Sequence, residues 1–133
     1  MYASVAIKVA IERPYDQVYE LLVEPLFFGR WAVNPDTTME PLGGEDWLVE
    51  LPRGQAVIRF TARNEFGVLD YQTFAIGATG GPVTPVRLLR NDDGCELMLV
   101  WQQRPGVSDE KFHSDAEWVA SDLQRLKTLI EGG

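Results

Sequence analysis

The sequence predicts an α+β fold in which one face of a seven-stranded antiparallel sheet is covered by a long C-terminal helix. Three observations predict it. Apolar residues alternate near the N-terminus, turn-forming residues divide residues 36–104 into six β-like runs, and apolar residues recur at helical spacing over residues 112–130. A chain of 133 residues without repeats or low-complexity tracts is expected to form a single domain, residues 1–133.

The N-terminal segment has the period-two pattern of a half-buried strand. Its larger apolar residues are Val5, Ile7, Val9 and Ile11. Pro14 suits the first position of a helix, because the first N–H groups of a helix have no intrahelical partner. We therefore expect a short helix over residues 15–24. Pro25 interrupts that helix, so residues 26–31 are predicted to form a second short helix or a tight apolar turn.

The turn-forming residues also predict how the strands pair. They fall at residues 43–44, 52–54, 64–67, 77–82 and 91–94. Centring antiparallel pairs on three of these turns predicts Leu51–Ala56, Val49–Ile58 and Trp47–Phe60, then Phe60–Tyr71, Ile58–Thr73 and Ala62–Leu69, and finally Leu88–Leu97, Val86–Leu99 and Thr84–Trp101. Apolar residues then share one face. The opposite face collects Arg59, Thr61, Arg63, Asp70, Gln72, Arg87 and Glu96.

The last segment predicts the helix that covers the apolar face. Its apolar stripe consists of Phe112, Ala116, Val119, Leu123, Leu126 and Ile130. Ser108 can cap the helix, with acidic residues in the first turn. Ser114 with Glu117 is a second possible capping box and start. Gly132 and Gly133 are expected to end the helix.

The charge balance excludes several partners. Twelve Lys and Arg against 20 Asp and Glu give a net charge of −8, which argues against binding nucleic acid or an anionic membrane. It also argues against an anion-binding patch on the polar face of the sheet. We favour cross-strand ion pairs there, such as Arg59 with Asp70 and Arg87 with Glu96.

Cysteine and histidine are too scarce for several kinds of site. A single cysteine excludes an internal disulfide, and a single histidine excludes a histidine-based metal cluster, so we predict no metal and no cofactor. The N-terminus lacks the basic region of a signal peptide, and no apolar run approaches the roughly 20 residues of a membrane helix. We therefore expect a cytoplasmic protein without membrane insertion.

Four other features have a structural interpretation that we favour over a chemical one. His113 is expected to be a partly exposed residue near a helix start rather than a catalytic base. Cys95 is expected to be a small strand residue whose acidic neighbours raise the pKa of the thiol. The acids Asp36, Glu40, Glu45 and Asp46 lack the spacing of a calcium loop. Residues 77–81 lack the lysine of a phosphate loop, and we expect a mobile hairpin or the lip of a cavity.

The predicted covered face carries more polar side chains than a solid core needs. Seven residues would face the interior: Trp31 from the short helices, and Trp47, Phe60, Tyr71, Thr73, Trp101 and Gln103 from the strands. A buried polar group without a partner costs about 1–3 kcal/mol. The polar residues of this set therefore indicate a partly hollow, wet interior, the mixture typical of ligand sites. A filled core whose polar atoms bond locally is the alternative.

The order of elements and several motifs resemble the START/SRPBCC superfamily. The segment Ile11–Tyr19, IERPYDQVY, followed by Pro25–Trp31, PLFFGRW, resembles its opening of strand, proline, helix and tryptophan. Residues 115–131 resemble the closing helix of bacterial polyketide cyclase/dehydrase-like members, and residues 64–71, NEFGVLDY, resemble uncharacterised bacterial proteins of that group. The resemblance implies a helix-grip fold, in which a bent sheet wraps around the last helix and leaves a cavity.

The leading hypothesis is therefore a binding module for a small hydrophobic molecule that is lipid-like, aromatic or polyketide-like. Its apolar walls would be Trp31, Phe60, Tyr71 and Trp101, while Thr73 and Gln103 would orient a polar group. One alternative is a cyclase, dehydratase or hydrolase that uses Tyr71 or a cavity carboxylate as acid or base. Another is a protein-interaction module of the chaperone-ATPase-activator kind. We expect a monomer or a homodimer.

Overall fold

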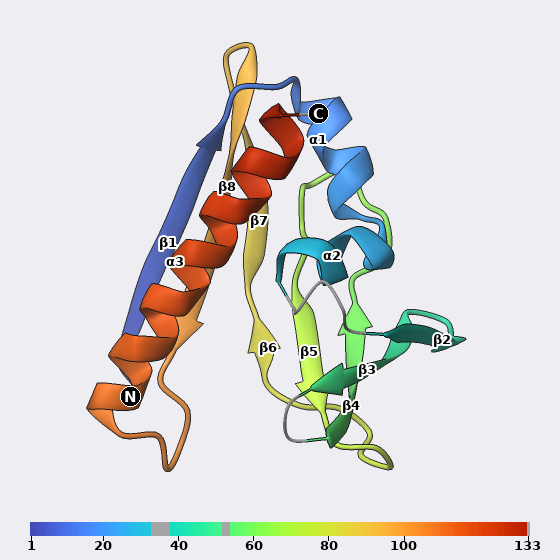
Figure 1. Cartoon of the computed structure of the whole chain (residues 1–133), viewed down its shortest axis with the longest axis vertical. Coiled ribbons are helices and arrows are strands. Elements are labelled where there is room, and N and C mark those ends of the chain that lie inside the picture. Colours follow the sequence, from blue (N-terminus) through green and yellow to red (C-terminus); the bar gives the residue numbers. More distant parts are fainter. Residues whose placement is uncertain (33–37, 52–53, 133) are drawn as a thin grey trace.

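The computed structural model describes residues 1–32, 38–51 and 54–132, which form three helices and eight strands (Figure 1). In chain order they are β1 (Ser4–Ile11), α1 (Tyr15–Leu22), α2 (Pro25–Trp31), β2 (Met39–Gly43), β3 (Asp46–Leu51), β4 (Gly54–Phe60), β5 (Tyr71–Phe74), β6 (Val83–Thr84), β7 (Val86–Asn91), β8 (Gly94–Gln102) and α3 (Asp109–Glu131). The fold is α+β, and the long C-terminal helix follows the strands as predicted.

The strands form two sheets rather than the single predicted sheet of seven strands. One sheet has the order β1-β8-β7, and the other has the order β2-β3-β4-β5-β6. Pro85 separates β6 from β7, because proline has no N–H to donate to a neighbouring strand. The predicted pair of Thr84 with Trp101 is therefore wrong, and Thr84 pairs with Tyr71 of β5.

The two sheets are joined along the segment that precedes β5. The Leu69 N–H donates to the Val86 carbonyl over 2.9 Å, and the Leu88 N–H donates to the Gly67 carbonyl over 2.9 Å. Gly67 has a φ of +68°, and a Cβ at this position would collide with the Leu88 carbonyl. The close approach of residue 67 to β7 therefore requires glycine. Through these two hydrogen bonds the segment before β5 connects one sheet to the other.

Two of the three predicted registers are confirmed. The pairs found as predicted are Phe60–Tyr71, Ile58–Thr73, Leu88–Leu97 and Val86–Leu99. The ladder of β4 with β5 ends at Phe60 and Tyr71, so the predicted pair of Ala62 with Leu69 lies outside it.

The third register, between β3 and β4, is displaced by two residues from the prediction. Pairing continues to Leu51 opposite Gly54, so Val49 lies opposite Ala56 and Trp47 lies opposite Ile58. Gly54 has a φ of +121°, a conformation that glycine adopts readily, and β4 begins at this residue. Because the displacement is an even number of residues, the apolar side chains keep their predicted face.

The polar face of the sheets is occupied by ion pairs, as expected, but with different partners. Arg59 pairs with Asp46, which lies directly opposite it in β3, at 2.7 Å. Arg87 pairs with Asp70, and Glu96 pairs with Lys8 of β1 at 3.0 Å. The predicted partners were wrong because Asp46 of β3, Lys8 of β1 and Asp70 in the segment before β5 supply the paired charges instead.

The helix α3 begins and ends at predicted capping residues. Ser108 is the N-cap, and its side chain accepts a hydrogen bond from the Lys111 N–H over 3.1 Å. The alternative start at Ser114 is wrong, and Gly132 is the C-cap. Of the predicted stripe, Ala116 and Val119 are half-buried. The fully covered members are Phe112, Leu123, Leu126 and Ile130.

The C-terminal end of α3 is fastened to the end of β1 (Figure 1). The Glu131 carboxylate accepts a hydrogen bond from the Glu12 N–H over 2.8 Å. Lys127 donates to the Ala10 carbonyl and to the Glu131 carboxylate, each over 2.6 Å, and Arg13 donates to the Glu131 carbonyl. The hydrogen bonds from the Glu12 N–H and from Lys127 to the carboxylate lower the pKa of Glu131, as do the charges of Lys127 and Arg13.

The two short helices form as predicted. Pro14 lies one residue earlier than expected, as the N-cap of α1 rather than its first residue. Pro25 is at the first turn of α2, which confirms a helix rather than a turn over this segment. The α2 helix buries Phe28 and Trp31, and it lies above the ends of β4 and β5 (Figure 1).

Leu126→Ala is expected to lower the free energy of unfolding by about 2–5 kcal/mol, because the truncation leaves a cavity at a side chain that is 0% exposed. Urea unfolding followed by circular dichroism measures the change. Leu89→Ala is the matched control, since Leu89 is 41% exposed and its truncation is expected to cost no more than about 0.5 kcal/mol. Equal losses in both variants would contradict the central place of α3 in the core.

Candidate functional site

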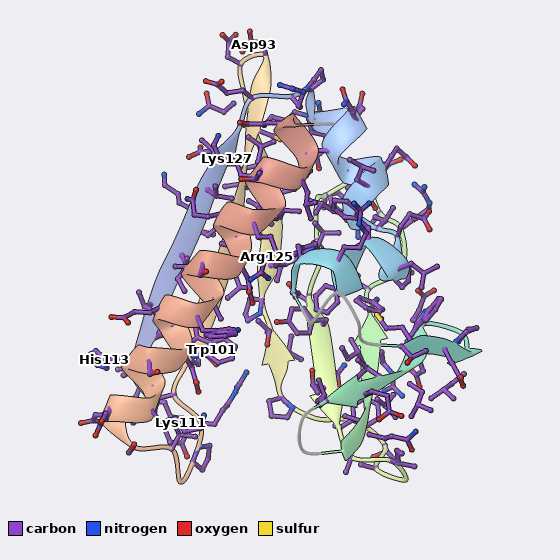
Figure 2. All side chains as sticks on the ribbon, viewed as in Figure 1. Asp93, Trp101, Lys111, His113, Arg125 and Lys127 are labelled. Atoms are coloured by element: carbon purple, nitrogen blue, oxygen red, sulfur yellow. The ribbon has the colours of Figure 1, made fainter. Side chains whose placement is uncertain are left out.

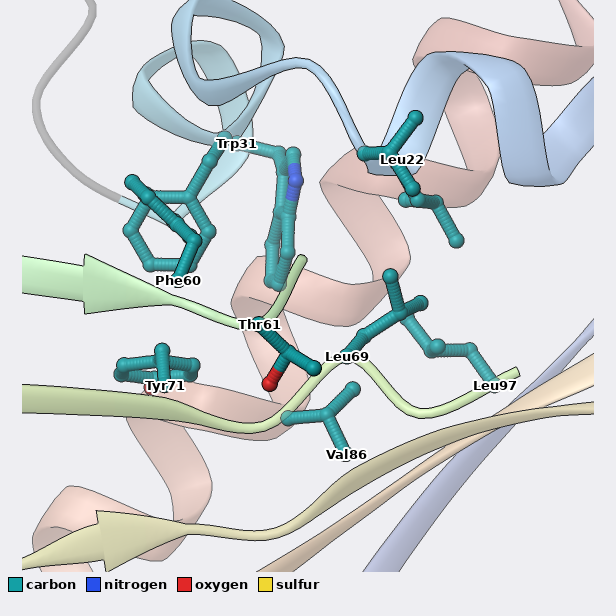
Figure 3. A pocket seen from close by; sticks show the side chains of 10 residues that line it. Leu22, Trp31, Phe60, Thr61, Leu69, Tyr71, Val86 and Leu97 are labelled. Carbon is teal, nitrogen blue, oxygen red and sulfur yellow. The ribbon is translucent and has the colours of Figure 1, made fainter. Parts of the chain in front are cut away.

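An internal cavity lies between α2 and the ends of β4, β5 and β7 (Figure 3). Its volume is about 20 Å³, which is enough for about one water molecule. The side chains around it are Leu22, Val23, Phe28, Trp31, Phe60, Thr61, Leu69, Tyr71, Val86 and Leu97. Three predicted site residues, Trp31, Phe60 and Tyr71, are therefore brought together, and the interior beside them is almost filled.

Phe28 is the centre of the aromatic cluster at this cavity. Its ring makes edge contacts with Trp31, Phe60 and Tyr71, at centroid distances of 5.3, 5.1 and 5.1 Å. Sequence reasoning did not select Phe28, although it precedes Trp31 by three residues and so shares its helix face. Figure 3 shows the Trp31 indole reaching from α2 towards the strands, with Phe60 and Tyr71 on one side and Leu22 on the other.

A second hollow, of about 190 Å³, adjoins Tyr71 near the end of β8. Thr73 and Trp101, both predicted site residues, line it together with Tyr71. The structure adds three residues that the sequence analysis did not select: Pro82, Thr84 and Arg104. Tyr71 lines both hollows, so the aromatic cavity and this more polar space adjoin the same side chain.

The remaining two predicted site residues lie elsewhere. Trp47 is half-buried in β3, opposite Pro41 of β2 and Ile58 of β4. The Gln103 amide donates to the Val107 carbonyl and to the Asp109 carboxylate, each over 2.8 Å. Gln103 therefore ties the loop before α3 to the first turn of that helix.

Tyr71 keeps its proton at neutral pH. Burial raises the pKa of Tyr71 to about 12, against a lowering effect of its side-chain hydrogen bond with Thr84. The charges of Asp122 and Arg104 also act on the phenol, in opposite directions. The hydroxyl can therefore orient a ligand by hydrogen bonding, whereas a base would require it to ionise.

Asp122 is a buried carboxyl that the sequence analysis did not single out. Burial raises the pKa of Asp122, while the neighbouring Arg125 lowers it. Arg125 lies 3.0 Å from the carboxylate and also donates to the Trp31 carbonyl over 2.8 Å, so it links α3 to the end of α2 (Figure 2). An aspartate at a polar position next to a leucine in the stripe gives no sequence signal for this role.

The other candidate groups have structural roles. His113 is exposed, with Nδ1 2.8 Å from the Asp109 carbonyl (Figure 2). Burial raises the pKa of Cys95, so the predicted direction is right although the cause is not its acidic neighbours. Asp46 is held by Arg59, and Asp36 lies outside the described residues. Among residues 1–32, 38–51 and 54–132, no cluster of three or more His, Cys, Asp or Glu could hold a metal.

Residues 77–81 lie in the loop between β5 and β6, directly before Pro82. The Gly81 N–H donates to the Gln72 side chain over 3.2 Å, and Pro82 lines the second hollow. A Cβ on Gly81 would lie 2.6 Å from the Thr73 carbonyl oxygen, so glycine allows this close approach.

Comparison with known proteins gives matches in structure only. No protein-family model matches the sequence, and a search of the curated proteins finds no match. The Aha1 dimer from Colwellia psychrerythraea is 14% identical, with 95% of this chain and 94% of that chain covered and a TM-score of 0.70. Ara h 8.0201 is 12% identical, with 100% of both chains covered and a TM-score of 0.68.

A third solved structure, CalU16 from Micromonospora echinospora, is 19% identical, with 98% of this chain and 76% of that chain covered and a TM-score of 0.66. Likeness at such low identity shows the fold alone. That fold is the helix-grip fold implied by the motif resemblance. None of the described helices is long and apolar enough to cross a membrane.

The raised pKa of Tyr71 predicts a stability loss at alkaline pH that depends on this residue. Between pH 10 and about pH 12 the unfolded chain loses the Tyr71 proton while the native protein keeps it. The native state therefore loses stability as the pH rises through this window, and Tyr71→Phe is expected to remove that part of the loss.

Urea unfolding at a series of pH values measures this effect, and phenolate absorbance follows the titration directly. Tyr2→Phe is the control, because Tyr2 is exposed at the N-terminus. If Tyr71→Phe removes a phenol that titrates near pH 10 in the native protein, the assignment of Tyr71 as a buried, protonated donor is wrong.

Proposed function

We propose that this protein binds a small hydrophobic molecule next to Tyr71, between α2 and the strands. None of the described residues that line the two hollows belongs to α3, although the helix-grip resemblance implies a cavity between the sheet and that helix. The observation that carries the proposal is the aromatic cluster of Phe28, Trp31, Phe60 and Tyr71 around an internal cavity of a helix-grip fold. Apolar walls with a few placed hydroxyl groups are typical of ligand sites. The ligand would be lipid-like, aromatic or polyketide-like.

Binding would require the aromatic side chains to rearrange. Sites for small organic ligands commonly have volumes of about 300–1,000 Å³, far more than the cavity of about 20 Å³ beside Trp31. Moving the Tyr71 ring would join this cavity to the hollow of about 190 Å³ on its other side. A ligand would thus favour an open arrangement of the same residues over the closed one.

The short α2 helix is the element whose movement would open the cavity most directly. It supplies both Phe28 and Trp31, and its end is held by the hydrogen bond from Arg125 to the Trp31 carbonyl. The contacts that close the cavity are edge contacts between rings, each contributing about 0.5–1.5 kcal/mol beyond the area they bury. A hydrophobic ligand can replace such contacts with its own.

Binding is better supported than catalysis at this site. The Tyr71 hydroxyl keeps its proton at neutral pH, which suits a group that orients a ligand by donating a hydrogen bond. No aspartate or glutamate is among the described residues that line the two hollows, and the nearby Asp122 carboxylate is held by Arg125. A homodimer of this chain is compatible with its similarity in fold to the Aha1 dimer.

Nile red, an uncharged hydrophobic dye, is expected to bind saturably and to raise the melting temperature. A ligand at about 100 times its Kd stabilises the native state by about 2.7 kcal/mol. Bound dye is also expected to quench Trp31, which lines the cavity, more than Trp118, which is 71% exposed on α3. Fluorescence titration and thermal unfolding of the full chain measure these effects.

Trp31→Phe and Trp118→Phe are the matched pair of variants for this measurement. Trp31→Phe is expected to remove part of the quenched emission, with Trp101 at the adjoining hollow supplying the rest, and Trp118→Phe is expected to leave the quenching unchanged. The absence of saturable binding and of thermal stabilisation, with Nile red and with a panel of hydrophobic metabolites, would refute the proposed function.

A further inference from the structure

The hollow near the end of β8 contains the guanidinium group of Arg104. Arg104 is half-buried, donates to the Val83 carbonyl over 3.0 Å and lies 3.4 Å from the Gln102 amide oxygen. Within the described part of the chain, Arg104 forms no ion pair. The cations that do pair with carboxylates are Lys8, Arg59, Arg63, Arg87, Arg90, Lys111, Arg125 and Lys127.

The other groups of this hollow suit an oxyanion. Thr73, Thr84 and Tyr71, each with a hydroxyl group, line the same space as the guanidinium. A hydroxyl group can both donate and accept a hydrogen bond, so the bond between Tyr71 and Thr84 leaves one of these two protons for a ligand. Arginine binds carboxylate and phosphate groups through parallel N–H donors, and charge-assisted hydrogen bonds are stronger than neutral ones. The protein has a net charge of −8, whereas Arg104, which forms no ion pair with the described residues, gives this hollow a positive charge.

The position of this hollow relates it to the aromatic cavity. Tyr71 borders both spaces, with Phe60 and Trp31 on one side and Thr73 and Arg104 on the other. Trp101 adds an apolar wall to the polar side, where it lies beside the N-terminal half of α3 (Figure 2). A molecule that occupied both spaces would therefore have an apolar body and a polar end.

The nearby acidic group does not oppose an anion at this place. Asp122 influences Tyr71 electrostatically, yet its carboxylate is paired with Arg125 at 3.0 Å. Arg104 and Arg125 thus have different surroundings, and only Arg125 has its charge balanced by a neighbouring carboxylate within the described residues. The charge available to a ligand is that of Arg104.

We propose that the ligand is an amphipathic acid, whose oxyanion head group binds Arg104 with the hydroxyls of Thr73 and Thr84, and whose apolar part extends past Tyr71 into the aromatic cavity. This inference rests on the proposed function and specifies its ligand class. The head group is a carboxylate or a phosphate monoester, since both present oxygens that match the guanidinium.

Displacement of Nile red by four ten-carbon chains tests the inference on the full protein, below the micelle concentration of each. The probes are decanoate, decyl phosphate, decanol and decyltrimethylammonium. At least one of the two acids is expected to bind about tenfold more tightly than decanol, as a charge-assisted hydrogen bond would provide. That preference is expected to weaken as the salt concentration rises. The acid that binds more tightly identifies the head group.

Arg104→Gln is expected to abolish the preference for the acid while leaving the affinity for decanol unchanged. Arg104→Lys, which keeps the charge, is expected to retain part of the preference and controls for structural damage, with thermal unfolding of each variant as a check on folding. Arg30→Gln is the matched control, because Arg30 is an exposed arginine on α2 that lies over the Phe27 ring. It is expected to behave like the unchanged protein.

The possible failures are distinguishable. Equal affinities for the acids and decanol, tighter binding of the ammonium compound, or an acid preference that survives Arg104→Gln would overturn the inference and leave the proposed function standing. If none of the four chains displaces Nile red and none stabilises the protein, the proposed function fails with it.

Discussion

The missing N–H of Pro85 is the constraint on which the arrangement of this molecule depends. It divides what would be one long strand, so that Thr84 joins the sheet of β5 while Val86 joins the sheet of β8. The division places the Thr84 side chain beside Tyr71, at the point where the two sheets part. Both hollows border Tyr71, and their different chemistry follows from this one change of partner.

Much of the fold could be predicted because local signals and periodicity agree with the final packing. The alternation in β1, the caps of α3 and two hairpin registers all follow from patterns within a few residues. The break at Pro85 was missed because the apolar alternation continues across it. The ion-pair partners were missed for a related reason: a charge is paired by whichever strand lies nearest, and the order of strands depends on distant contacts.

The candidate site could be predicted only in part. Trp31, Phe60, Tyr71, Thr73 and Trp101 were selected by the face on which they lie, and the structure gathers them around two adjoining hollows. Periodicity cannot show that a loop returns Arg104 to this place, or that Gln103 turns instead towards Asp109. Periodicity also cannot give the volume of the interior, because that volume depends on how closely the Phe28 and Trp31 side chains of α2 pack against the strands.

The fastening of α3 at one end has a mechanical consequence. Lys127 and Glu131 bind the helix to β1, and the residues buried most completely lie in its C-terminal half. Towards the N-terminus the stripe becomes half-buried at Val119 and Ala116, beside the hollow that Trp101 lines. The helix is thus held most firmly at its C-terminal end. We therefore expect movements of α3 to be smallest at this C-terminal end and larger towards Ser108.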